Sequence, residues 1–83
     1  MLRNGVLLKL SPKEFDLLSF LMRNRGRVFS RESLVERVWG YDYAGTARTV
    51  DVHVSSLRQK IENDPEKPVH LLTVHSFGYK FEG

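Results

Sequence analysis

The segment between residues 48 and 62 decides the fold, and it reads Arg48-Thr49-Val50-Asp51-Val52-His53-Val54-Ser55-Ser56-Leu57-Arg58-Gln59-Lys60-Ile61-Glu62. When residues are placed at about 100° per step around a helix, the apolar side chains gather on one narrow stripe formed by Val50, Val54, Leu57 and Ile61. A stripe of this kind faces a protein core. We therefore expect a helix that begins near Thr46, ends near Glu62 and packs on the core through this stripe.

The face opposite the stripe differs from an ordinary solvated helix face, which is rich in glutamate and lysine. Its residues are Arg48, Thr49, Val52, Ser55, Ser56, Gln59 and Lys60, with His53 at the shoulder. Hydroxyl and amide groups hydrogen-bond to base edges, basic groups reach phosphates or guanine, and a valine meets a thymine methyl. The pattern favours recognition of a DNA groove. The alternative is that Val52 packs on a neighbouring element or on a partner chain.

The titratable residues near this helix form no catalytic or metal-binding pattern. We expect Asp51, at the edge of the apolar stripe, to hold Arg48 or Arg58 in place rather than to contact a base. None of the three histidines is spaced i, i+4 from another on a helix, so we expect no metal site. No nucleophile elbow, phosphate loop or pair of carboxylates is present, and we expect no catalytic residues and no cofactor.

A helix with clear ends lies upstream. Ser11 is placed to cap it, Pro12 suits the first helical position, and Glu14 closes a capping box. The helix should end at residues 24–26, where Gly26 supplies a left-handed cap. Its apolar stripe, which we expect in the core, consists of Phe15, Leu18, Leu21 and Met22, widened by Leu17 and Phe20.

Shorter elements complete the order. Ser30 is expected to cap a helix that ends at Gly40 and presents Leu34, Val35 and Val38 on one face. Residues 6–10 predict a strand, residues 27–29 a bridging strand, and residues 69–81 a hairpin with an aromatic second strand. A strand, three helices and a closing hairpin are the order of an α+β winged helix-turn-helix domain, here one domain over residues 1–83.

Composition excludes several classes of protein. A length of 83 residues, with 41% apolar and 28% charged residues, fits one globular domain. The absence of cysteine excludes disulfides, thiolate nucleophiles and cysteine-based zinc sites. The apolar runs are too short for a membrane span or a signal peptide, so we expect a cytoplasmic protein with no membrane partner.

Charge adds a weaker argument for an anionic partner. The net charge is +3, and the excess lies in residues 1–41, where eight basic residues face four acidic ones. Five arginines cluster near the end of the first helix and the start of the next: Arg23, Arg25, Arg27, Arg31 and Arg37. A guanidinium binds phosphate with two hydrogen bonds at once. The alternative is that these charges stabilise a helix C-terminus and form a solvated face.

Four motifs in order resemble the DNA-binding effector domain of OmpR/PhoB-type bacterial response regulators, over nearly the whole chain. They are Leu10-Ser11-Pro12-Lys13-Glu14-Phe15-Asp16-Leu17-Leu18, Val38-Trp39-Gly40-Tyr41-Asp42, Arg48-Thr49-Val50-Asp51-Val52-His53-Val54 and Gly78-Tyr79-Lys80-Phe81. The resemblance implies that the helix after residue 46 enters the major groove and that the hairpin is a wing at the adjacent minor groove. The residues it implies at DNA are Arg48, Thr49, His53, Ser55, Ser56 and Arg58, with Thr73 and His75 on the wing.

The resemblance also implies partners other than DNA. In such domains the loop that here comprises Tyr41, Asp42, Tyr43, Ala44, Gly45 and Thr46 can contact RNA polymerase or a neighbouring domain. From the residues alone, its tyrosines are expected to pack back on the helices. A receiver domain, absent from this chain, would normally control the module, and two copies can bind DNA as a tandem dimer.

Three departures from the family pattern bear on DNA binding. Ser55 and Ser56 stand where close relatives often place arginines, which should lower phosphate affinity or alter base preference. Residues 75–77, His-Ser-Phe, replace the usual Arg-Gly-x, so the wing lacks its arginine. The family's domain opens with a sheet of about four strands, whereas this chain supplies residues 6–10 and a fragment at residues 1–3. This implies a truncated or reduced sheet with an exposed edge.

The expected function is sequence-specific binding of double-stranded DNA in transcriptional regulation within a two-component system. The alternative is a winged-helix module that binds protein, favoured by the modest net charge, by the missing wing arginine, and by exposure of Tyr41, Tyr43 and Phe77. An enzyme is the least favoured class.

Overall fold

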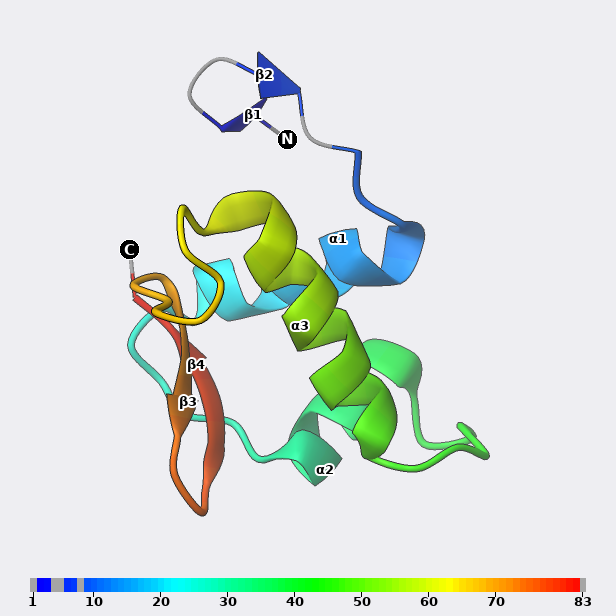
Figure 1. The fold of residues 1–83 in the computed structure, drawn as a ribbon. Coiled ribbons are helices and arrows are strands. Elements are labelled where there is room, and N and C mark those ends of the chain that lie inside the picture. The colour runs from blue at the N-terminus through cyan, green and yellow to red at the C-terminus, as the bar shows by residue number, and fades with distance from the viewer. Residues whose placement is uncertain (1, 4–5, 8, 83) are drawn as a thin grey trace.

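The elements follow the predicted order in the computed structural model, which describes residues 2–3, 6–7 and 9–82. They are β1 (Leu2–Arg3), β2 (Val6–Leu7), α1 (Pro12–Arg23), α2 (Arg31–Leu34), the π-helix η1 (Val35–Trp39), α3 (Arg48–Ile61), β3 (Leu71–Val74) and β4 (Gly78–Phe81). Helix α3 crosses in front of α1, and the β3–β4 hairpin runs alongside α3 (Figure 1). This is the predicted winged helix-turn-helix, and the hairpin is called the wing below.

The capping signals of α1 are confirmed. The Glu14 N–H donates to Ser11 Oγ at 3.2 Å, and the Ser11 N–H donates to Glu14 Oε1 at 2.7 Å, which closes the predicted capping box. Gly26 follows the helix with φ +84°, as expected for a left-handed residue after a helix end.

The predicted apolar stripe of α1 is partly wrong. Leu17, Leu18 and Leu21 are buried, but Phe15 is 49% exposed and Met22 is 43% exposed. Helix α1 packs on α3 and β4 through the arc that contains the three leucines and Glu14, and this arc is narrower than the apolar pattern suggested. Phe15 and Met22 therefore lie at its solvent side.

The helix capped by Ser30 changes its winding part-way. Ser30 Oγ accepts the Ser33 N–H at 3.0 Å, as predicted, and four residues of α-helix then continue as a π-helix up to Gly40, where φ is +105°. The wider turn closes with the Gly40 N–H donating to the Val35 carbonyl at 2.8 Å. Such turns are frequent at functional sites, and this one sets the position of Trp39.

The wing is fixed to the segment before α2 through the backbones of Phe29 and Tyr79. Strands β3 and β4 are antiparallel, with Leu71 opposite Phe81 and Thr73 opposite Tyr79. Phe29 forms the predicted bridge, exchanging backbone hydrogen bonds of 2.9 Å with Tyr79. At Gly78 a Cβ would lie 1.9 Å from the Phe29 carbonyl oxygen, so only glycine fits there. This close approach holds the wing against the segment before α2.

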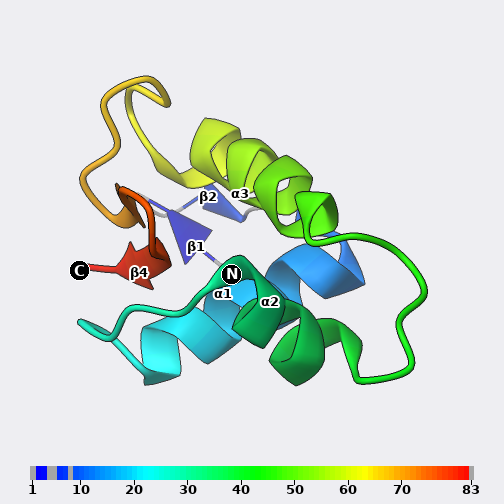
Figure 2. The same ribbon diagram turned by 90° about the horizontal axis from the view of Figure 1, so that it is seen from below.

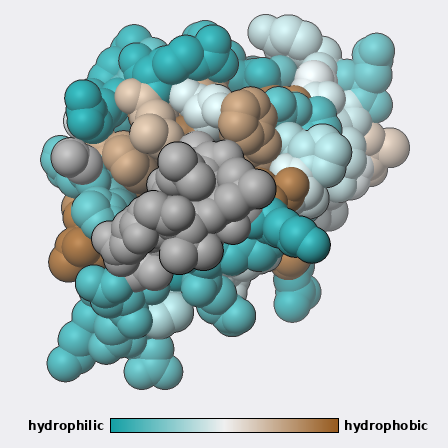
Figure 3. All heavy atoms as spheres, turned by 90° about the horizontal axis from the view of Figure 1, so that it is seen from above, coloured by the Kyte–Doolittle hydropathy of each residue, from teal (hydrophilic) through white to brown (hydrophobic). Residues whose placement is uncertain are grey.

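The N-terminal strands are shorter than predicted. Strand β1 pairs with β2 in antiparallel register, Leu2 opposite Leu7 and Arg3 opposite Val6. The strand predicted over residues 6–10 covers Val6–Leu7; residue 8 lies outside the described residues, and Lys9 and Leu10 are not in a strand. The predicted fragment at residues 1–3 appears as β1, apart from Met1, which also lies outside the described part. Around this pair the surface is largely hydrophilic, with separate apolar patches (Figure 3).

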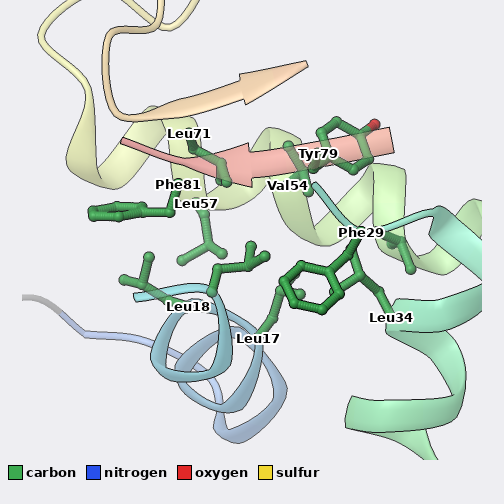
Figure 4. Packing of buried hydrophobic residues seen from close by; sticks show 11 residues of the cluster. Leu17, Leu18, Phe29, Leu34, Val54, Leu57, Leu71, Tyr79 and Phe81 are labelled. Carbon is green, nitrogen blue, oxygen red and sulfur yellow. The ribbon is translucent and has the colours of Figure 1, made fainter. Parts of the chain in front are cut away.

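The core lies between the helices and the wing. Leucines of α1 point towards Leu57 of α3 and Phe81 of β4, while Phe29 and Leu34 close the side near α2 (Figure 4). On α3, Val50, Val54 and Leu57 are fully buried and Ile61 packs on the core, as predicted. None of the helices in the described residues is both long and apolar enough to span a membrane.

Candidate nucleic-acid interface

Helix α3 leaves one line of side chains open to solvent, called the outer face below. It consists of Arg48, Val52, Ser55 and Gln59, all exposed. Their side chains make no hydrogen bond or ion pair within residues 9–82. Val52 is 59% exposed, so it does not pack on a neighbouring element of this chain. The outer face offers a guanidinium, a hydroxyl and an amide around one apolar side chain.

The side of α3 next to the wing is held by Arg58 and Asp51. Arg58 donates from Nε to the Leu71 carbonyl at 2.9 Å and from a terminal nitrogen to Thr73 Oγ1 at 2.8 Å. Asp51 accepts the Tyr79 hydroxyl at 2.6 Å and pairs with Arg31 at 2.9 Å. The prediction that Asp51 holds Arg48 or Arg58 is wrong, because the N-terminus of α2 brings Arg31 to it from a distant part of the sequence.

The pKa of the Tyr79 hydroxyl is raised by its burial and by the contact with Asp51. Burial raises its pKa, and the hydrogen bond to Asp51 and the charge of that carboxylate raise it further, to about 12. The phenol therefore stays protonated and remains a donor to Asp51 at any physiological pH.

Glu62, at the C-terminal cap of α3, fixes where the wing begins. Its carboxylate is 4% exposed and accepts the backbone N–H groups of Val69, His70 and Leu71 at 3.0, 3.0 and 2.8 Å. Burial alone would raise the pKa of Glu62, but these hydrogen bonds outweigh it and lower the pKa. Sequence reasoning missed this role, and the signal for it was an acidic residue at a helix end followed by a turn.

The opposite side of α3 is held by Glu14 of α1. Glu14 accepts hydrogen bonds from Lys60 Nζ at 2.7 Å and from the Ser56 hydroxyl, while its helix-capping bond to Ser11 remains. Burial alone would raise the pKa of Glu14, but the bonds from Lys60, Ser56 and Ser11 lower it to about 2. Ser56 and Lys60, predicted to face DNA, thus lie on the flank of α3 with their polar groups engaged.

His53 and Thr49 lie towards the same flank. His53 Nδ1 is 2.8 Å from the Thr49 carbonyl oxygen, and its ring meets the edge of Trp39 at a centroid distance of 4.9 Å. Both residues are half-buried. Among the described residues, no cluster of histidines and carboxylates is arranged to hold a metal ion.

The wing presents the two predicted residues differently. Thr73 and His75 are both exposed, but Thr73 accepts the hydrogen bond from Arg58, which ties it to α3. An open hollow of about 420 Å³ lies between the wing and the starts of α2 and α3. Arg31, Asp51 and Thr73 line it, together with the wing tip.

The loop of residues 41–46 is exposed throughout and projects from the side of the helices (Figure 2). Tyr43 packs back in part, with its ring 6.2 Å from that of Trp39, whereas Tyr41 is 85% exposed. The expectation that both tyrosines pack on the helices therefore holds only for Tyr43.

Three of the five arginines clustered in the sequence have separate local partners. Arg23 donates to the Ser19 carbonyl near the end of α1 at 3.3 Å, Arg27 lies 5.6 Å from the Phe29 ring centre, and Arg31 pairs with Asp51. These contacts favour the alternative of helix-end and surface charges over one phosphate-binding cluster.

Residues 5–81 match the family described as "Transcriptional regulatory protein, C terminal". The chain belongs to this family. It is 60% identical over 80 residues to the sensory transduction protein RegX3 of Mycolicibacterium smegmatis, a match that covers 96% of this chain and 35% of RegX3. The chain thus spans about a third of the length of the curated relatives it matches.

Solved structures agree with the family. The response regulator DrrB of Thermotoga maritima, described as an OmpR/PhoB homolog, superposes with a TM-score of 0.88 and 38% identity, covering 95% of this chain and 36% of DrrB. The RstA DNA-binding domain of Klebsiella pneumoniae, solved in complex with the RstA box, superposes with a TM-score of 0.82 and 33% identity. The match covers 96% of this chain and 80% of the RstA chain. The resemblance to OmpR/PhoB-type effector domains is confirmed, and the domain is a regulatory one rather than an enzyme.

Proposed function

We propose that this chain is the DNA-binding effector domain of a bacterial two-component response regulator and that it inserts α3 into the major groove of double-stranded DNA. The observation that carries the proposal is the outer face, a line of side chains with no hydrogen-bond or ion-pair partner within residues 9–82, on a helix fixed at both flanks. The RstA domain, with a similar fold, was solved with DNA bound. A rigid support lowers the ordering cost of binding.

The outer face supplies distinct chemistry for base recognition. Arg48, at the start of α3, reaches a phosphate or the O6 and N7 atoms of guanine, and Gln59 hydrogen-bonds to adenine. Ser55 suits either type of base, and Val52 meets a thymine methyl. His53, Ser56 and Lys60 are proposed to act mainly by setting the angle of α3, because their polar side-chain groups already have partners there. Thr49 is half-buried on the same flank, where its backbone carbonyl is the partner of His53, and is proposed to act in the same way.

The partners of the whole protein belong to the same proposal. A receiver domain in the longer protein would control the module, the loop of residues 41–46 would contact RNA polymerase or that domain, and two copies would bind repeated half-sites in tandem. The function is exercised in the cytoplasm, where the DNA is.

The proposal is tested by binding of labelled duplex DNA at several salt concentrations. With about four to six phosphates neutralised, log affinity should fall against log salt with a slope of roughly −4 to −5. Arg48→Ala should weaken binding about tenfold and reduce the slope by about 1, since one counterion fewer is released. Arg25→Ala removes an exposed arginine outside α3 and is the matched control.

A flat salt dependence, or equal losses in both variants, would contradict the proposal. The second candidate, a module that binds protein, is favoured by the 85% exposure of Tyr41. It predicts no binding to any duplex at low salt.

A further inference from the structure

Helix α1 turns a partly apolar stripe to solvent on the side away from the core. Phe15, Ser19 and Met22 follow one another at steps of four and three residues, so they lie on one side of the helix. Phe15 and Met22 are exposed, and Ser19 between them is half-buried. The solvent side of an amphipathic helix is ordinarily polar or charged. Two large apolar side chains on either side of a small one therefore resemble a helix-packing surface, which the described residues leave uncovered.

A carboxylate and a guanidinium flank this stripe at matched positions. Asp16 directly follows Phe15 in the sequence, and both are exposed. Arg23 directly follows Met22 in the same way, and both of these are exposed. Asp16 forms only a loose ion pair with Lys13, at 3.9 Å, and Arg23 has no ion-pair partner among the described residues. Two opposite charges are thus available to a partner.

The order of these side chains is complementary to itself when it is reversed. If a second α1 lies antiparallel on the first and crosses it at Ser19, positions three or four before this residue fall opposite positions four or three after it. Phe15 then meets Met22 of the second copy. Asp16 meets Arg23 of the second copy, and each contact occurs twice, as in any two-fold interface. The small side chain of Ser19 at the crossing allows the helices to approach closely.

The surface beside the stripe leaves room for a second copy. An open hollow of about 510 Å³ lies between α1 and η1, and Phe20 and Val38 form its apolar part. The Phe20 ring is supported by an edge-to-face contact with Phe29, at a centroid distance of 4.9 Å. Arg37 also lines the hollow, exposed and without an ion pair in the part of the chain that the structure describes. The hollow extends the contact beyond one helix and adds a second guanidinium for a carboxylate.

We propose that the exposed face of α1 is the surface through which two copies of this domain associate, helix against antiparallel helix. The match of both apolar contacts and charges under reversal identifies the partner as a second copy. A single pair of helices buries less than the roughly 800 Å² per partner of a standard interface, so we expect a weak dimer with a dissociation constant of about 10–100 μM. This contact differs from a tandem arrangement, in which copies are related head to tail and each uses a different surface.

The direction of this face gives the dimer a role, which rests on the proposed function. Helix α1 packs on α3 through its buried arc, and α3 turns its outer face away from the core. The two faces therefore lie on opposite sides of the domain, as the positions of α1 and α3 show (Figure 2). In the dimer both outer faces point outwards, so each copy can hold its own duplex. The pair would bridge two DNA segments instead of occupying adjacent half-sites.

Sedimentation velocity of the 83-residue chain tests the association, at concentrations on both sides of the expected dissociation constant. The wild type should shift from monomer to dimer as concentration rises. Asp16→Arg and Arg23→Asp each place like charges opposite each other twice and should weaken the association about tenfold or more. The double variant, Asp16→Arg with Arg23→Asp, restores both pairs and the net charge and should restore the dimer.

Two controls make the same changes of charge at exposed positions outside α1. They are Asp42→Arg and Arg25→Asp, and both should associate as the wild type does. Thermal unfolding followed by circular dichroism shows that each variant is folded.

A cross-link tests the antiparallel geometry. The chain contains no cysteine, so Ser19→Cys introduces a single thiol at the expected crossing. Two copies should then form a disulfide under mild oxidation, because the Cα atoms of a disulfide lie about 4.4–6.8 Å apart. Ser55→Cys places the thiol on the outer face of α3 and should cross-link far less.

Bridging is measured with one duplex fixed to beads and one labelled duplex in solution, both selected by the chain from a random-sequence library. The wild type should carry the labelled duplex to the beads. Asp16→Arg should not, although it binds a single duplex at least as tightly as the wild type. A chain that dimerises and binds DNA but does not bridge overturns the bridging role.

Three results overturn the association while the proposed function stands. They are a monomer at every concentration, a dimer that the single charge reversals leave unchanged or that the double variant fails to restore, and equal cross-linking of the two cysteine variants. If the chain dimerises as expected but selects no duplex, the association stands and the proposed function fails.

Discussion

Two buried glutamates help to hold α3, Glu14 beside one flank and Glu62 at the C-terminal cap, and the two differ in what they bind. Glu14 and Glu62 are both 4% exposed. Glu62 binds three consecutive backbone N–H groups and so shapes the turn into the wing, whereas Glu14 binds Ser56 and Lys60 and so sets the angle of a finished helix. Glu62 therefore holds the turn into the wing in its fold, whereas Glu14 orients a helix that is already formed. Loss of the first should therefore cost more stability than loss of the second.

The largest effect is expected for Glu62→Ala. It leaves the N–H groups of residues 69–71 without their acceptor, and unsatisfied buried donors cost roughly 1–3 kcal/mol each before water relieves them. We expect the free energy of unfolding to fall by about 3 kcal/mol or more, measured by urea denaturation. Glu66→Ala, which removes an exposed glutamate from the same loop, should change it by less than about 0.5 kcal/mol. Equal stabilities of the two variants would show that the turn holds without Glu62.

Acid should weaken the Glu14 anchor in a defined window of pH. Because the pKa of Glu14 is about 2 in the folded chain against 4.5 for an ordinary glutamate, its contribution to stability is present above about pH 4.5 and is lost as pH falls towards 2. The difference between these two pKa values corresponds to about 3 kcal/mol of stability at most.

Glu14→Gln should therefore lower stability at pH 7 by about 1–3 kcal/mol and make the fall in stability between pH 5 and 2 shallower. Thermal unfolding at a series of pH values measures both. Glu36→Gln alters an exposed glutamate and should follow the wild-type profile. Parallel profiles for wild type and Glu14→Gln would contradict the low pKa of Glu14.

The smallest effect is expected at Tyr79, a second contact on the wing side. Tyr79→Phe removes the hydrogen bond to Asp51 and should cost about 1 kcal/mol. In the wild type the phenol pKa is about 12, so the contribution of this group to stability is present below about pH 10 and is lost as pH rises towards 12. Absorbance at about 295 nm should show one of the three tyrosines titrating late. Tyr41→Phe should leave that late step in place, and a late step that persists in Tyr79→Phe would exclude the assignment.

Local patterns in the sequence predicted the fold well, but contacts between distant residues limited how well the candidate site could be predicted. The caps at Ser11 and Ser30 and the stripe on α3 depend on neighbours within a turn or two, so they were visible. Burial of Phe15 and Met22 was predicted wrongly, because which arc of α1 is covered depends on distant elements.

The same limit applies to the candidate site. The face opposite the stripe was found from the sequence, but Glu14 binds Ser56 and Lys60 across 42 and 46 residues. Such pairs leave no periodic signal. The outer face therefore contains fewer residues than the set that the sequence predicted to face DNA.

Gly78 has a consequence for how this domain can change. The wing is clamped at Phe29 by backbone atoms alone, directly beside the turn of residues 75–77. That attachment uses no side chain of the turn, so those three residues can be exchanged while the wing keeps its place. The chemistry of the wing tip can therefore change while the rest of the domain keeps its structure.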